Sequence, residues 1–114
     1  MKSIHYQQVV EKPVNDPEAR DVFIRVVIGP EDGAGNFHMR YFRVLPGGHT
    51  PHHAHPWEHE NYVVAGKGEV VTPDGPRAVG PGDVVFIEAG MKHQYRNAGD
   101  TDFEFLCLIP AVNP

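Results

Sequence analysis

Histidine is concentrated in one short part of this sequence. Five of the eight histidines fall within residues 49–59, in the segment PGGHTPHHAHPWEHENYV. Neutral imidazole binds zinc, copper, iron and nickel, and it binds manganese where geometry and metal supply favour that ion. A single histidine is usually a surface residue or a satisfied core residue, so the spacing of these side chains decides whether they could share an ion.

The spacing predicts one metal site with four imidazole ligands. His53 and His55 are two residues apart, so on a β-strand both side chains leave from the same face, although that face could also be solvent-exposed. The chain bends at Pro56-Trp57-Glu58, His59 opens the next strand, and His93 opens a later one. We therefore expect a single divalent transition metal ion to be bound by His53, His55, His59 and His93.

Two other interpretations of this segment have to be weighed. His55 and His59 are four residues apart, as on the helix of a zinc protease. Pro56, the β-rich flanks and the absence of an H-E-x-x-H order argue against such a helix. His52 could replace His53 as a ligand, but the two-residue spacing would then be lost.

The distribution of glycine and proline in the rest of the chain is typical of an all-β protein. Twelve glycines and eleven prolines break it into short runs, and no amphipathic helix of useful length is evident. We expect a β-prone run over 4–10, one helical turn near Asp16-Pro17, and an antiparallel sandwich or barrel thereafter. Its strands are predicted within residues 21–29, 36–48, 61–66, 67–75, 76–83, 84–90, 93–100 and 103–110.

Charge and composition exclude several function classes. Ten Lys and Arg against fifteen Asp and Glu argue against a nucleic-acid surface, which needs clustered basic residues. No apolar run approaches the length of a membrane span, and the first residues lack the apolar core of a secretory signal. One cysteine, Cys107, cannot form an internal disulfide, so a cytoplasmic location is expected.

Two motifs make the chain resemble the cupin superfamily. The first cupin motif, G-x5-H-x-H-x(3,4)-E-x6-G, is matched over residues 47–66. His59 takes the place of the motif's glutamate, because six residues separate it from Gly66 and only five follow Glu60. The second motif, G-x5-P-x-G-x2-H-x3-N, is matched over residues 82–97 with Glu88 in place of proline. The runs HPWEHE and FLCLIP are similar to those of small bacterial manganese cupins with four-histidine sites.

The resemblance implies a fold, a cofactor and an assembly. It predicts a single cupin domain over 1–114, a double-stranded β-helix (jelly-roll) barrel with the ion inside, and a homodimer. Residues 1–20 would form an N-terminal arm that could exchange between protomers. Manganese is the expected ion, with iron, nickel, zinc and copper as alternatives, because the sequence does not fix the metal.

Alternation along two strands suggests which side chains surround the ion. We expect an apolar wall with one thiol on the last strand, from Phe105, Cys107 and Ile109. Arg40 and Phe42 share a face of an earlier strand and could anchor or shield a bound anion. The plain alternative for all five is core packing, and for Arg40 it is a solvent-facing cation. Cys107 is expected to be a buried small side chain and not a nucleophile.

Four neutral imidazoles would leave the full charge on the ion and, in an octahedral site, two open cis positions. That is typical of a catalytic centre acting on a small anionic or chelating substrate. We expect a manganese- or iron-dependent dioxygenase. The alternatives are a non-redox isomerase, lyase or decarboxylase, and a ligand-binding or sensor module without turnover.

Overall fold

A computed structural model of the chain describes residues 1–111. It contains nine β-strands and two single turns of 3₁₀ helix, and no α-helix occurs within these residues. The elements in chain order are η1 Tyr6–Gln8, β1 Lys12–Pro13, β2 Arg20–Ile28, η2 Pro30–Asp32, β3 Phe37–His49, β4 His59–Ala65, β5 Gly68–Thr72, β6 Gly75–Val79, β7 Val84–Ile87, β8 Gln94–Asn97 and β9 Phe103–Pro110.

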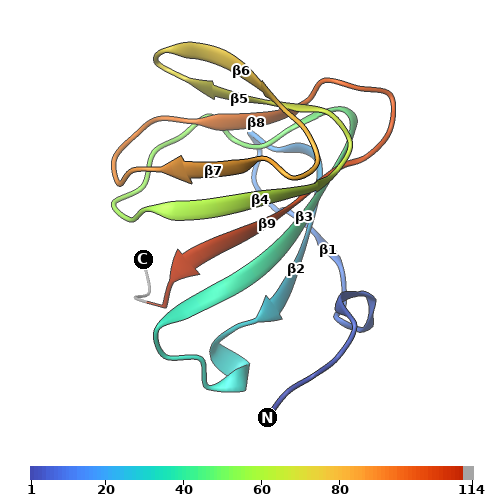
Figure 1. Ribbon diagram of the computed structural model, residues 1–114, viewed down its shortest axis with the longest axis vertical. Coiled ribbons are helices and arrows are strands. Elements are labelled where there is room, and N and C mark those ends of the chain that lie inside the picture. The colour runs from blue at the N-terminus through green and yellow to red at the C-terminus, as the bar shows by residue number, and fades with distance from the viewer. Residues whose placement is uncertain (112–114) are drawn as a thin grey trace.

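The strands form one sheet that curls into a half-barrel (Figure 1). Their order is β6-β5-β8-β3-β9-β4-β7, with β2 on the other edge of β3 and β1 beside β2. Every pairing is antiparallel. The all-β barrel of short antiparallel strands predicted from the sequence is therefore confirmed.

Period-two alternation separates the interior of the barrel from its surface. In β4 the residues His59, Asn61 and Val63 are buried, and the residues between them are exposed. Phe103 and Phe105 on β9 are almost completely buried and face the same interior. The outer face of β4 and β7 exposes large apolar side chains, namely Tyr62, Val64, Val84 and Phe86.

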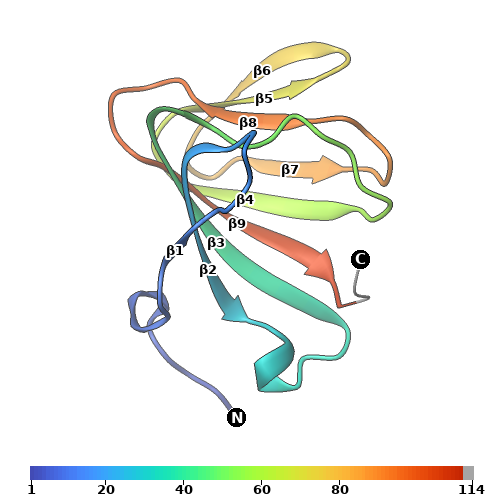
Figure 2. The same cartoon turned by 180° about the vertical axis from the view of Figure 1, so that it is seen from behind.

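The N-terminal part differs from the prediction. The run over 4–10 does not form a strand; it contains η1, because the His5 ring accepts a hydrogen bond from the Gln7 amide and caps the turn. Tyr6 then stacks on Tyr41 of β3, and the arm lies along β2 and β3 of its own chain (Figure 2). Exchange of this arm between protomers remains a prediction.

Two further expectations about local structure need correction. The segment at Asp16 is a hydrogen-bonded turn, in which the Ala19 amide donates to the Asp16 carbonyl, and it is not a helical turn. Strand β3 does not end at Pro46-Gly47-Gly48 but continues to His49. Gly47 has φ of 81°, and the register against β2 shifts there, so an irregularity absorbs the turn signal without ending the strand.

None of the helices within residues 1–111 has the length and apolar character that crossing a bilayer would require.

Candidate metal centre

The backbone brings the two histidine segments together. His53 and His93 form an isolated antiparallel bridge and exchange two hydrogen bonds of 3.1 and 2.9 Å. The Gly90 amide donates to the His55 carbonyl at 2.8 Å. Gly90 has φ of 81°, a conformation that glycine adopts without steric cost, so the chain can turn there and enter the bridge. These bonds place residues 35 and 40 positions apart in contact.

Three imidazoles form a cluster that could hold a metal ion. One ring nitrogen each of His53, His55 and His93 lies within 4.8 Å of the others. His59 is outside that set, but its Nε2 lies 3.0 Å from Nε2 of His93. Both His59 and His93 are only 3% exposed, whereas His53 lies at the surface. The cluster therefore runs from solvent into the barrel.

Backbone carbonyls determine how two of the rings present their nitrogens. Nδ1 of His93 donates to the Met91 carbonyl at 2.8 Å, and Nδ1 of His55 donates to the Trp57 carbonyl at 3.2 Å. A carbonyl can only accept, so the ring proton is on Nδ1 and the Nε2 lone pair is free. The His55 ring also stacks on the indole of Trp57 at 4.3 Å between centroids, which fixes its plane.

An asparagine that the sequence analysis did not single out orients His59. Asn61 Nδ2 donates to the Leu106 carbonyl at 3.1 Å, so its Oδ1 faces the ring and accepts from His59 Nδ1 at 3.1 Å. The hydroxyl of Tyr95 donates to the same oxygen. Alternation from His59 would have placed Asn61 inside the barrel. Its partners, however, come from other strands and leave no local signal.

The donor set fits a cation. His59 and His93 both carry their proton on Nδ1, so two Nε2 lone pairs face each other at 3.0 Å with no proton between them. Such an arrangement is repulsive unless a positive charge lies near both atoms. Two nitrogen ligands about 2.1 Å from one ion and at right angles to each other are about 3.0 Å apart.

Burial keeps the rings in the neutral form that metals require. Burial, with a smaller contribution from the neighbouring His93 and His55 and against an opposing effect of the Asn61 hydrogen bond, lowers the pKa of His59 to about 3. Burial is also the main cause that lowers the pKa of His55 and of His93. Protonated imidazole cannot bind a metal, so these shifts favour a metal-competent site at neutral pH.

A cavity of about 610 Å³ adjoins the four histidines, and we call it the imidazole cavity. Four of the five predicted surrounding residues line it: Arg40, Phe42, Phe105 and Cys107. Ile109 is on the same face of β9 but lines a separate pocket, together with Phe37 and His59. Trp57, placed at a turn by sequence, also lines the imidazole cavity.

The thiol of Cys107 contacts both His59 and Arg40. Cys107 Sγ is 3.7 Å from His59 Nδ1, and the Arg40 guanidinium donates to it at 3.0 Å. Cys107 is 3% exposed and packs in the core, as predicted.

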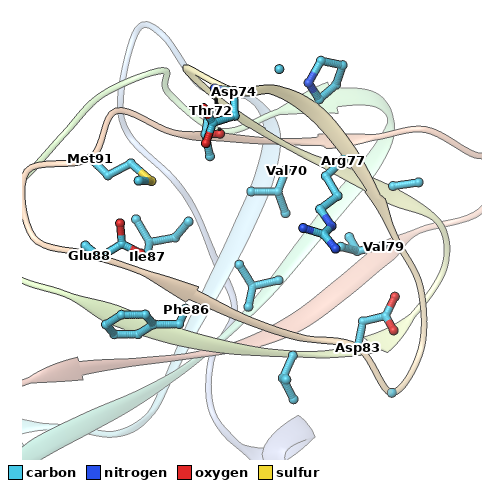
Figure 3. A pocket seen from close by; sticks show the side chains of 16 residues that line it. Val70, Thr72, Asp74, Arg77, Val79, Asp83, Phe86, Ile87, Glu88 and Met91 are labelled. Atoms are coloured by element: carbon cyan, nitrogen blue, oxygen red, sulfur yellow. Dashed lines mark hydrogen bonds between the residues drawn. The ribbon is translucent and has the colours of Figure 1, made fainter.

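A second and larger cavity of about 940 Å³ lies between the β5–β6 hairpin and β7, and we call it the hairpin cavity. Figure 3 shows Arg77 pointing into it from the hairpin, with Ile87, Glu88 and Met91 on the other side. No histidine lines it. Its charged side chains are exposed, so it offers no buried donor set.

A search for known families identifies residues 40–109 as a cupin domain. The chain belongs to the cupin family. The predicted jelly-roll class is thereby confirmed, and the matched part contains all four histidines.

Several known proteins are similar to this cupin. The polyketide cyclase RemF of Streptomyces resistomycificus is 37% identical, with a TM-score of 0.94 over 100% of this chain and 82% of that one. Protein SchB of Streptomyces halstedii is 33% identical over 80% of this chain and 67% of its own. A 1-methylthio-D-xylulose 5-phosphate methylsulfurylase of Rhodospirillum rubrum is 36% identical over 64% of this chain; the aligned part spans about half of that relative, 47%.

Proposed function

We propose that this cupin binds one divalent metal ion through His53, His55, His59 and His93 and uses it to convert a small substrate that chelates through oxygen. The observation that carries the proposal is the pair of facing Nε2 atoms of His59 and His93 at 3.0 Å, each with its proton held on Nδ1. His59 thereby joins the three-histidine cluster as a fourth ligand. Manganese is our proposed ion, although zinc or copper would bind more tightly in vitro.

The reaction class we propose is an aldol-type cyclisation: a carbon next to one carbonyl loses a proton, the resulting enolate carbon bonds to a second carbonyl carbon of the same substrate, and the oxygen of that carbonyl takes up a proton. When bound, a divalent ion would supply Lewis-acid polarisation of a carbonyl oxygen. The chain's own part is to hold four neutral nitrogens in place and to keep water from the reacting atoms with Phe42, Trp57 and Phe105. The likeness to the polyketide cyclase RemF over the whole chain supports this class.

The test is to load the purified protein with manganese and with zinc and to measure ions per chain. A panel of β-diketones and linear polyketones is then incubated with and without dioxygen. We expect about one ion per chain and loss of a polyketone without dioxygen uptake. Protein that binds no ion, or a loaded protein that turns over none of the panel, would contradict the proposal.

Dioxygen-dependent cleavage is the second candidate. It was expected from the sequence resemblance, and a four-nitrogen site that opens on a cavity of about 610 Å³ leaves room for dioxygen beside a substrate. Uptake of dioxygen above that of the metal alone, in step with substrate loss, would favour this candidate over the cyclase. A homodimer, a cytoplasmic location and an anionic or chelating ligand remain predictions.

A further inference from the structure

Arg40 is a cation that lines the imidazole cavity and has no acidic partner within residues 1–111. It lies on β3 opposite Cys107 of β9, and both side chains face the barrel interior. The six ion pairs found within residues 1–111 do not include it. In the same part of the chain, Arg20, Arg25, Arg43 and Arg96 all pair with carboxylates.

The donors of this guanidinium are poorly satisfied. It has five N–H groups, and its hydrogen bond within the described residues goes to the Cys107 thiol, a weak acceptor. Its Nε is buried and has no partner in the described part of the chain. The Phe42 ring, 5.1 Å from the guanidinium carbon, holds the group in place without neutralising it. An unsatisfied buried donor on a charged group is costly, so the site favours an acceptor brought by a ligand.

The charge of the cavity points to the same kind of ligand. Neutral imidazoles would not cancel the charge of a bound divalent ion, and Arg40 adds another positive charge close enough to act on His55 and His59. Asp16 and Lys12 also line the cavity, and their opposite charges offset each other. Within residues 1–111, no carboxylate that lines the cavity forms an ion pair with Arg40.

We propose that Arg40 binds a carboxylate oxygen of the substrate and makes the imidazole cavity selective for carboxylates. Guanidinium and carboxylate can form two parallel hydrogen bonds, so the group would also fix the orientation of the ligand. The inference rests on the proposed function, since it assigns the substrate class of that same site. It makes Arg40 a specificity-determining residue and not a metal ligand.

The test uses a matched pair of probes, acetylacetone and its carboxylated analogue 2,4-dioxopentanoate. Trp57 is the single tryptophan and lines the cavity, so its fluorescence reports binding there, and calorimetry gives an independent affinity. The variants are Arg40→Met, Arg40→Lys and, as a control in the hairpin cavity, Arg77→Met. We expect Arg40→Met to weaken 2,4-dioxopentanoate about 10- to 100-fold, the range of a charge-assisted hydrogen bond.

The control results separate selectivity from packing. Acetylacetone affinity and metal content should stay within about twofold of the unmodified protein in Arg40→Met, and Arg40→Lys should recover part of the carboxylate preference. Equal loss of both probes, or unchanged preference for the carboxylate, would overturn the assignment. If Arg40→Met fails to fold, Arg40→Lys and Arg40→Gln supply the same comparison.

The same titrations are repeated on metal-free protein. There we expect the preference for 2,4-dioxopentanoate to persist and to depend on Arg40. A preference that disappears with the ion would show that the metal and not Arg40 selects the anion, which overturns the proposal. Failure of the four-histidine site, by contrast, would appear as absent metal with the preference intact.

Discussion

The two cavities of this barrel differ in what lies at their walls more than in their size. The hairpin cavity is the larger, about 940 against 610 Å³, yet it contains no histidine, and its charged residues are exposed. The imidazole cavity is lined by buried rings and by a guanidinium that has no carboxylate partner within residues 1–111, and a buried asparagine behind its wall orients one of the rings. A candidate functional site is therefore identified by buried polar groups that converge and are held in a fixed orientation. The volume of a cavity alone is a poor guide to such a site.

Removal of a central histidine should have the largest effect on the difference between the imidazole cavity and the hairpin cavity. We expect His93→Ala to reduce metal content from about one ion per chain to nearly none, because it deletes the ring that packs against the rings of His53, His55 and His59. Metal analysis after dialysis measures this. His52→Ala is the matched control, since His52 is exposed and is the alternative ligand suggested by sequence. Metal loss in His52→Ala with retention in His93→Ala would reverse the assignment.

The next largest effect is expected for Asn61, which orients the His59 ring. Asn61→Ala removes the acceptor of His59 Nδ1 and should weaken metal binding about 10- to 100-fold. Competition with a chromophoric chelator gives the affinity. Tyr95→Phe is the control, because it removes the other bond to Asn61 Oδ1 and leaves the His59 bond in place. A loss as large in Tyr95→Phe as in Asn61→Ala would mean that packing, and not ring orientation, sets the affinity.

A smaller effect concerns the segment over residues 12–16, which lines the imidazole cavity and has no counterpart at the hairpin cavity. Glu11 ties it to Arg43 through bonds of 2.7 and 3.0 Å, and the Arg43 hydrogen bond lowers the pKa of Glu11. A carboxyl whose pKa is lowered in the folded state stabilises the folded protein at pH values above its ordinary pKa of about 4.3. That stabilisation is lost as the pH falls through the pKa of the folded state. Glu11→Gln should cost about 1 kcal/mol at pH 7.

The measurement is urea unfolding of metal-free protein at several pH values. The difference between Glu11→Gln and the unmodified chain should shrink towards zero in acid, because titration of all other groups is common to both. A difference that is constant with pH would show that the carboxylate charge is not what anchors the segment.

The smallest effect is expected in the larger cavity. Arg77→Ala and Glu88→Gln change charged side chains that line it without making ion pairs in the described residues. Each should alter the free energy of unfolding by about 0.5 kcal/mol or less and leave metal content unchanged. Thermal denaturation and metal analysis check this. A change in metal content in either variant would mean that the two cavities are coupled.

Much of this architecture could be predicted from sequence because it depends on local patterns. Alternation along the strand predicted that His59 faces the interior and Glu60 faces solvent. The number of residues before Gly66 assigned His59, and not Glu60, to the glutamate position of the first cupin motif. The arm over 4–10 was misjudged because a cap formed by His5 competes with strand propensity. Asn61 was missed because its orientation depends on the Leu106 carbonyl, which lies 45 residues away.

The backbone bridge between His53 and His93 links the ion to the integrity of the barrel. Opening the loop over residues 50–58 would break the bridge and the bond from Gly90 to the His55 carbonyl. A ligand that binds only the closed form opposes such local unfolding in proportion to the logarithm of its concentration over its dissociation constant. Amide hydrogen exchange at His53, Gly90 and His93 would then slow as metal is added. The ion would thus reversibly stabilise the contact between two loop segments that the backbone itself joins through one isolated bridge.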